Sequence, residues 1–416
     1  MAEMLPEVLL ADIQRIVLDG PGKEAEQATY AFLEVAKPDA ARRRLASMLD
    51  GRRPGDPWRL SCSARSQETD GAKLSSVSTS LGLTATGLAA LGVGDDVLAT
   101  FPLEFKQGPH DRCEFLGDIG ENDPENWHKP FKRDDFTRLH VVLSVWEPAD
   151  GTKGDDVVNE LDSTGSPLEL LKHFKGRRLH ENREPFGFVD GGGQPFIPGV
   201  RPRSADGHKR ENEAPLGEFV LGHPTQFGDA VRQWRVPGVE TPPERRVGMN
   251  GSFAALRVMR QDVAEFKKWE AEHGRQAAER LCGVTVDGHE LPGDDPRPID
   301  SHVGRANPRQ ALASRGHHRR RLIRRGMPYA WPDPDGEQPD EEGMIGLFIC
   351  ANLAAQYEGV LGEWLHNGIH DPGVTGTNDP FVGFQSVASK KPQFVFTKGV
   401  SYLFLPARSG LQKIVR

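Results

Sequence analysis

The spacing of apolar residues predicts helices in the first part of the chain. Apolar positions recur at intervals of three and four in residues 5–20 and 24–50, which is the period of one helical face. Within the second segment, residues 29–35 (TYAFLEV) begin like a strand. Thr84 before an apolar stretch and Gly92 after it predict a further short helix with a capped start.

Apolar and β-branched runs predict strands farther along the chain. The run RLHVVLSVWEP, residues 138–148, is bounded by charge and proline and should form a buried strand. The remaining segments predict strands at 217–222 and 251–261, helices at 156–174 (interrupted at 163–167) and 262–281, a strand running into a helix at 344–365, and a closing hairpin at 393–407. Strands and helices therefore mix without regular alternation, which favours an α+β fold over a doubly wound sheet.

The length of the chain indicates more than one domain. A chain of 416 residues is best explained by two domains, and two similar α+β halves are plausible, although no internal repeat is visible in the sequence. Residues 211–251 are long and rich in proline and glycine. Such a segment is expected to be a linker or a loop that wraps around a domain.

Composition and charge narrow the class of protein. The formal net charge of −8 argues against nucleic acid or an anionic membrane as the main partner. No apolar run is long enough to span a bilayer, and residues 1–20 carry acids where a signal peptide carries bases, so we expect a cytoplasmic protein. The four cysteines contain no Cys-x-x-Cys pair, which favours reduced thiols over a disulfide or a metal site.

The segment REPFGFVDGGGQPFIPG, residues 183–199, surrounds Asp190 with five glycines and three prolines. Neither a helix nor a strand interior tolerates that mixture, so the segment should be an ordered loop or a tight crossing. Asp190 could simply cap a turn, as most aspartates near glycine do. It could equally be a short carboxylate that a rigid loop presents to a reacting group.

Two further segments could contribute to a site. In DSHVGRANPRQ, residues 300–310, His302 could bind a metal through one ring nitrogen while the other donates to an acceptor, or it could be an ordinary surface histidine. The basic run SRGHHRRRLIRRGMPYAW, residues 314–331, could be a solvated face, a nucleic-acid patch or a partly buried cluster of arginines. A buried arginine requires an anionic partner.

Together these segments suggest a histidine metal ligand, an acid and an arginine acting at one site. GFVDG, SHVGRANPR and RLIRRGMPY resemble, in this order, the GxxDG signature, the proximal haem-ligand segment and the distal-arginine segment of the dye-decolorising (DyP-type) peroxidases. The resemblance extends over nearly the whole chain, through segments such as GEFVLGHPTQFG and GLFICANLAAQYE. It implies two ferredoxin-like α+β halves of the dimeric α+β barrel type, 5–180 and 181–416, with the GxxDG loop at their junction and haem held mainly by the C-terminal half.

The resemblance also implies a chemistry. The chain would bind haem b, reduce hydrogen peroxide through a ferryl intermediate, and oxidise dyes, phenolics or other organic reductants. His302 would be the proximal iron ligand, Asp190 the acid–base group and Arg324 the cation that stabilises charge on the departing oxygen. Asp379 is the candidate acceptor for the second nitrogen of His302. The implied haem contacts are Gly191, Asn307, Arg309 as a propionate partner, and Leu347 and Ile349 as distal lining.

Two questions stay open at the level of sequence. Bulky dyes would have to react at the surface, and Trp331 and Tyr329 are candidates for electron transfer, although both could be core aromatics. Tyr357 stands where phenylalanine is commoner in the family, which affects pocket shape and substrate preference. The competing functions are a non-catalytic haem-binding protein, a carrier or an iron-releasing protein of the same fold, and a structural protein without haem.

Overall fold

The computed structural model describes most of the chain. The described residues are 5–22, 24–49, 55–63, 76–189, 193–200, 213–227, 236–238, 240–242, 245–308, 320–331, 340–382 and 393–416. Asp190, Gly191 and Arg309, three of the predicted site residues, lie outside these ranges.

The first half of the chain builds four antiparallel strands with helices between them. The strands are β1 (Gln27–Val35), β2 (Ser78–Leu83), β3 (Val141–Glu147) and β4 (Leu168–Arg177), and their order in the sheet is β4-β1-β3-β2. Helix α3 (Pro38–Ala46) follows β1 and helix α9 (Lys153–Leu161) follows β3. This is the order of a ferredoxin-like unit, in which two βαβ-type connections return to one antiparallel sheet.

The second half repeats this arrangement. Its strands are β5 (Ser252–Gln261), β6 (Ile323–Trp331), β7 (Glu341–Cys350) and β8 (Val395–Leu405), in the order β8-β5-β7-β6. Helices α10 (Val263–His273) and α11 (Arg275–Cys282) follow β5, and the π-helix η9 (Leu353–Leu365) follows β7. The chain therefore contains a structural repeat that its sequence does not reveal.

The two halves form one eight-stranded sheet. Strands β2 and β8 meet in the middle, where Leu83 pairs with Phe404. The outer strands β4 and β6 also lie against each other, because a Cβ added to Gly176 would be 2.6 Å from the Cγ of Met327 and 2.9 Å from the carbonyl oxygen of Pro328. The sheet thus curls toward a barrel, and Gly176 permits the close approach of its two edges.

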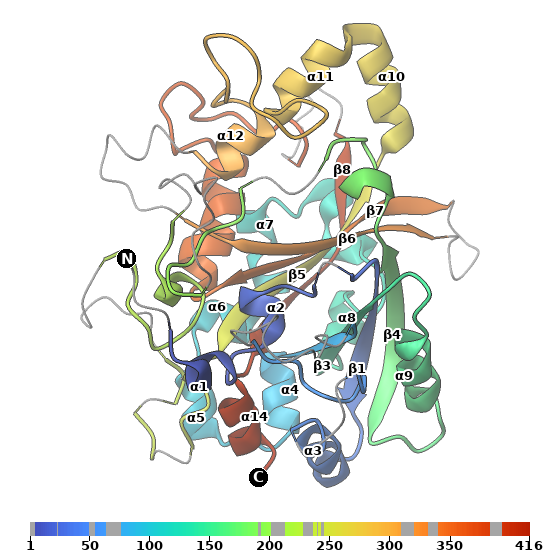
Figure 1. Cartoon of the computed structure of the whole chain (residues 1–416), viewed down its shortest axis with the longest axis vertical. Coiled ribbons are helices and arrows are strands. Elements are labelled where there is room, and N and C mark those ends of the chain that lie inside the picture. The colour runs from blue at the N-terminus through green and yellow to red at the C-terminus, as the bar shows by residue number, and fades with distance from the viewer. Residues whose placement is uncertain are drawn as a thin grey trace.

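The other helices cover the ends of the sheet. Figure 1 shows α10, α11 and α12 at one end of the molecule and α3, α5 and α14 at the opposite end. The remaining elements are α1 (Glu7–Leu10), α2 (Arg15–Leu18), α4 (Ala85–Ala90), α5 (Asp95–Ala99), α6 (Leu103–Gln107), η1 (His110–Arg112), α7 (Cys113–Leu116), η2 (Gly120–Asn122), η3 (Pro124–Asn126), α8 (Arg133–Phe136), η4 (His180–Asn182), η6 (Leu216–Glu218), α12 (His302–Ala306) and α14 (Arg408–Ile414).

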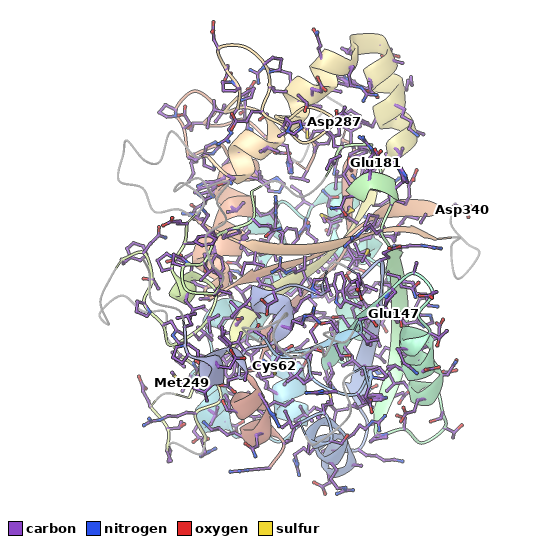
Figure 2. All side chains as sticks on the ribbon, viewed as in Figure 1. Cys62, Glu147, Glu181, Met249, Asp287 and Asp340 are labelled. Atoms are coloured by element: carbon purple, nitrogen blue, oxygen red, sulfur yellow. The ribbon has the colours of Figure 1, made fainter. Side chains whose placement is uncertain are left out.

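Apolar side chains from both halves pack into one continuous core, and Figure 2 shows side chains filling the space around the sheet. The Phe101 ring, from the segment between β2 and β3, contacts the rings of Phe253 and Phe404 at centroid distances of 6.3 and 5.3 Å. A smaller aromatic cluster around Phe186, Phe266, Phe381 and Phe394 lies at the α10 end. Because the halves share a sheet and a core, their division into domains at residue 180 stays a prediction.

Several predicted elements are confirmed and others are wrong. The capped helix at Thr84, whose hydroxyl accepts from the Gly87 amide, and the strands at 138–148 and 251–261 are confirmed. The second part of the predicted helix 156–174 is strand β4, because its edge pairing with β1 outweighs local spacing. The predicted strand at 217–222 contains the short helix η6 instead.

Two further corrections concern element boundaries. The predicted closing hairpin is the single strand β8, because its whole length pairs with β5. The predicted helix 262–281 is two helices, α10 and α11, separated at Gly274, whose φ of 90° ends the first helix. Strand β6 was identified in the sequence only as a motif and not as a strand.

We expect Gly176→Ala to destabilise the protein, because the added methyl group would meet β6 where the sheet edges approach. Overpacking of this kind typically costs about 1–3 kcal/mol. Chemical denaturation of the variant and of His173→Ala, an exposed position on the same strand, measures the difference. Equal stability of the two variants would contradict the close approach of β4 and β6.

Candidate active site

A large cavity opens between the second half of the sheet and the helices that cover it. Its volume is about 1040 Å³, at the upper end of the range of about 300–1,000 Å³ that is typical of ligand pockets. Strands β5 to β8, helices α12 and η9, the loop around 184–195 and the segment 282–299 line its walls. Three sequence motifs that are far apart in the chain, around His302, around Arg324 and in the glycine loop, therefore meet at one space.

His302 is the first residue of α12, and local contacts fix its place. The hydroxyl of Ser301 accepts from the Gly304 amide at 3.1 Å and donates to the Pro298 carbonyl at 2.6 Å, which caps the start of the helix. A Cβ at Gly304 would lie 2.0 Å from the Pro298 oxygen, so this turn accepts only glycine. The motif SHVG thus encodes a short, rigid turn that presents a histidine.

Asp379 holds one nitrogen of this histidine. The Nδ1 atom of His302 lies 3.0 and 3.1 Å from the two carboxylate oxygens of Asp379, which is fully buried. The amides of Phe381 and Val382 also donate to Asp379, at 2.8 and 3.0 Å. These contacts fix the direction of the imidazole ring and direct the Nδ1 proton toward the carboxylate.

The pair perturbs both titrating groups. Burial lowers the pKa of His302, but the charge of Asp379 and their hydrogen bond outweigh burial and raise the pKa above its ordinary value. Burial raises the pKa of Asp379, but His302 and the two backbone amides outweigh burial and lower the pKa. The positive charge of Arg324, which lines the same cavity, acts in the opposite direction and lowers the pKa of His302.

The second nitrogen of His302 is available for a ligand. His302 lines the cavity and a third of its side-chain surface is exposed. Among the residues that the structure describes, no protein group is hydrogen-bonded to Nε2. The same described residues contain no cluster of three or more His, Cys, Asp or Glu side chains that could hold a bare metal ion. A single available histidine nitrogen fits a metal cofactor whose other ligands belong to the cofactor itself.

Strand alternation separates the two adjacent arginines of β6. Arg324 lines the cavity and lies opposite Phe348, another lining residue, in the pairing of β6 with β7. Arg325 is on the other face of the sheet, where its Nε donates to the Ile16 carbonyl at 2.8 Å and its Nη2 donates to the Val17 carbonyl at 3.1 Å. Since successive side chains of a strand point to opposite faces, only Arg324 can act in the cavity.

The same alternation corrects the predicted lining by Leu347 and Ile349. Both side chains are buried in the core, and neither lines the cavity. Met344 and Phe348 of the same strand line it instead. The sequence motif therefore indicated the correct strand, but it did not show which of the alternating side chains face the cavity.

Of the two residues predicted to transfer electrons at the surface, the structure describes the side chain of Tyr329 but not that of Trp331. Tyr329 is 3% exposed, and its hydroxyl donates to Glu341 at 2.5 Å, so it is a core residue and not a surface aromatic. Trp331 is the last residue of β6, and its side chain lies outside the described part of the structure. Asn307 does line the cavity, and its side-chain oxygen accepts a hydrogen bond from Arg321.

The structure adds cavity residues that sequence reasoning did not single out. Arg320 and Arg321 line the cavity, and Arg320 also pairs with Glu363 and lies 5.2 Å over the Trp364 ring. The run GHHRRRLIRR marks this region as basic, but nothing in that run distinguishes these two arginines from the others. They provide positive charge where an anionic ligand group could bind.

A buried polar network forms part of the cavity wall. Arg257 of β5 pairs with Asp118, and its Nη1 donates to one Asp118 oxygen at 3.0 Å and to the Tyr357 hydroxyl at 3.2 Å. Thr397 of β8 donates to Asp118 at 2.8 Å. Burial acts to lower the pKa of Arg257, but Asp118 outweighs it and raises the pKa, so the guanidinium keeps its charge. Burial raises the pKa of Tyr357 to about 12.

Known proteins resemble this chain in sequence and in fold. No family model matches it. A dye-decolorizing peroxidase from Mycena epipterygia is 23% identical over 417 residues, covering 79% of this chain and 74% of that protein. A dye-decolorizing peroxidase structure in complex with cyanide superposes with a TM-score of 0.77 at 22% identity, covering 99% of this chain and 100% of the other. Another, in complex with 2,6-dimethoxyphenol, has a TM-score of 0.75 at 21% identity, with the same two coverages.

The chain is thus similar in sequence to dye-decolorising peroxidases and has their fold. It has the dye-decolorising peroxidase fold over nearly its full length, which confirms the predicted α+β class with ferredoxin-like halves. The cavity lies in the C-terminal half, where strands β5 to β8 form one wall and helices α12 and η9 form another. The described residues include no helix long and apolar enough to cross a membrane.

We expect Asp118→Asn to destabilise the protein strongly. The change leaves the buried guanidinium of Arg257 without its counter-ion, and breaking such a pair typically costs about 3–5 kcal/mol. Asp96→Asn is the matched control, because its partner Arg245 is exposed and such pairs contribute about 0–1 kcal/mol. Chemical denaturation measures both. A loss for Asp118→Asn no larger than for Asp96→Asn would contradict the assigned role.

Proposed function

We propose that this protein is a haem-dependent peroxidase that reduces hydrogen peroxide and oxidises dyes, phenolics or other organic reductants. The observation that carries the proposal is the His302–Asp379 pair, with its second imidazole nitrogen available at the wall of a large cavity that Arg324 also lines. The sequence resemblance and the shared fold support the same reaction class. The complex of a related structure with 2,6-dimethoxyphenol supports a phenolic reductant.

The cavity residues fit haem. The Nε2 of His302 is the proposed iron ligand, and Asp379, by accepting the hydrogen bond from Nδ1, would orient Nε2 toward the iron and strengthen it as a donor. Arg320, Arg321 and the predicted partner Arg309 would supply positive charge for the two propionates. Haem b is the proposed type, since the sequence has no Cys-x-x-Cys pair for covalent attachment.

Haem, when bound, would supply the redox-active iron at which peroxide reacts. Asp190 is the proposed group that takes the proton from the bound peroxide oxygen and returns it to the departing oxygen, a role worth typically about 10²–10⁴ in rate. Arg324 would stabilise the negative charge that develops on the departing oxygen, from a fixed position in the cavity wall. Met344 and Phe348, in place of Leu347 and Ile349, would shape the space above the reacting atoms.

The other expectations stand as proposals. Trp331 remains a candidate for electron transfer to bulky dyes, and buried Tyr329 could serve only as an internal step of such a route. Gly191 remains a proposed haem contact. The cytoplasmic location, and the absence of nucleic-acid and membrane partners, stay predictions.

Replacement of the proposed iron ligand should abolish stable haem binding. We expect His302→Ala to lose the Soret band, or to keep only weakly held haem, because Asp379 and the cavity remain but the ligand atom is gone. Haem content per chain after reconstitution and gel filtration is the measurement. His128→Ala, a partly exposed histidine outside the cavity lining, should retain full haem content. Unchanged haem content in His302→Ala would exclude His302 as the ligand.

Replacement of the proposed catalytic cation should slow the chemistry and spare haem binding. We expect Arg324→Leu to keep its Soret band and to react with hydrogen peroxide about 10²–10³-fold more slowly, the usual loss when a preorganised charge-stabilising donor is removed. Stopped-flow absorbance measures the rate.

Arg325→Leu provides the matched control, because that arginine is on the opposite face of the sheet. It should lose stability but react with peroxide at the wild-type rate. A wild-type rate in Arg324→Leu would remove this residue from the mechanism. It would favour the alternative of a non-catalytic haem carrier or iron-releasing protein.

A further inference from the structure

The side chain of Gln194 is hydrogen-bonded twice to the backbone of Arg324. Its Nε2 donates to the Arg324 carbonyl at 2.9 Å, and the Arg324 amide donates to its Oε1 at 3.2 Å. Arg324 lies near the start of β6, which is the last strand in the order of the sheet and pairs with β7 on one side. Because the amide and carbonyl of Arg324 bond to Gln194, they point to the other side of β6. The amide of Gln194 therefore takes the place that a further strand would occupy at this edge.

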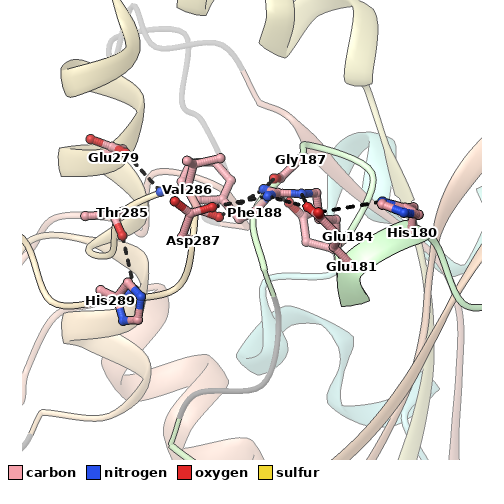
Figure 3. A network of polar contacts seen from close by, with 11 residues as sticks. His180, Glu181, Glu184, Gly187, Phe188, Glu279, Thr285, Val286, Asp287 and His289 are labelled. Atoms are coloured by element: carbon pink, nitrogen blue, oxygen red, sulfur yellow. Dashed lines mark hydrogen bonds and ion pairs between the residues drawn. The ribbon is translucent and has the colours of Figure 1, made fainter.

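Gln194 belongs to the glycine loop, which is also anchored at its other end. The Nη1 of Arg183 donates to the Gly187 carbonyl at 2.8 Å and to the Val286 carbonyl at 3.3 Å. The Val189 amide donates to the same Val286 carbonyl at 2.9 Å. Figure 3 shows the polar contacts that join this part of the loop to the segment 279–289. The loop is thus fixed before residue 190 by one segment and after it by the strand that carries Arg324.

We propose that Gln194 is a positioning residue for Arg324. It fixes the backbone from which the Arg324 side chain enters the cavity, and it ties that strand to the loop in whose sequence Asp190 precedes Gln194 by four positions. The inference rests on the proposed peroxidase function, in which the acid–base group and the cation must act on the same peroxide. A misplacement of about 1 Å at such a site can cost about 10²-fold in rate.

The chain offers an internal comparison for this contact. The side-chain amide of Gln14 makes the same pair of bonds to Leu81 of β2, donating to its carbonyl at 2.9 Å and accepting from its amide at 3.0 Å. Strand β2 has the same place in the first half of the sheet that β6 has in the second. Leu81 is a core residue outside the cavity lining, so this second contact has the geometry without the proposed chemistry.

The experiment compares Gln194→Ala, Gln194→Glu and Gln14→Ala in the haem-loaded protein. Haem content is measured from the Soret band, and the bimolecular rate with hydrogen peroxide by stopped flow. Amide hydrogen exchange of peptides that contain Arg324 reports on the contact itself and does not depend on activity. We expect Gln194→Ala to keep haem, to exchange faster at Arg324 and to react about 10-fold or more slowly with peroxide.

Three comparisons separate positioning from general stability. Gln194→Glu keeps the acceptor for the Arg324 amide but loses the donor, so it should recover part of the rate. In the Arg324→Leu background, Gln194→Ala should produce no additional loss of rate, because a residue that acts through Arg324 has nothing left to position. Gln14→Ala should lower the melting temperature and leave the peroxide rate unchanged.

The outcomes distinguish this inference from the proposed function. Faster exchange at Arg324 with an unchanged peroxide rate would overturn the positioning role, as would an equal loss of rate in the wild-type and Arg324→Leu backgrounds. If Gln194→Ala fails to fold, Gln194→Glu carries the same test, and a wild-type rate in that variant with faster exchange at Arg324 overturns the role. A wild-type protein without a Soret band or a reaction with peroxide would instead reject the peroxidase proposal.

Discussion

The hydrogen bond between His302 and Asp379 is the interaction on which the site depends. A fully buried carboxylate requires compensation, and Asp379 obtains it from one imidazole and two backbone amides. Asp379 in turn fixes the direction of the imidazole ring at the start of the five-residue helix α12. Because the ring has one direction, its second nitrogen faces the cavity that Arg324 also lines. The proposed chemistry requires this arrangement.

The sheet consists of two halves with the same strand order, and the site lies on the second half. Each half contributes four strands in the same order, and the halves join through β2 and β8 while β4 and β6 approach at the other side. Helix α12 with His302 belongs to the second half, and the first half supplies support, as in Asp118, which pairs with Arg257 in the cavity wall. Removal of that support should therefore affect the site as well as the stability of the fold.

Two polar constraints at the edge of the cavity connect otherwise separate segments. Gln194 binds the backbone of β6, and Arg183 binds the carbonyls of two loop segments. Both use side chains to satisfy backbone carbonyls or amides of adjoining segments, which the burial of polar groups requires. These contacts hold the described parts of the glycine loop, on either side of residues 190–192, against the segments that line the cavity.

The sequence by itself predicted the fold class, most element types and a candidate chemistry for the site. Helix caps, β-branched runs and the three motifs depend on neighbouring residues, so they are legible in the chain, as Thr84 and His302 show. Only the tertiary structure decided which face of a strand meets the cavity. That choice separates Arg324 from Arg325 and replaces Leu347 with Phe348.

The tertiary structure also decided features that depend on partners far away in the chain. The repeat of the two halves is visible in strand order but not in residue identity, because different apolar side chains can pack in the same arrangement of strands. Segment 168–177 is a strand because β1 pairs with it, whatever its local spacing. The buried pair of Arg257 and Asp118 joins residues 139 positions apart, and nothing in either neighbourhood indicates the other.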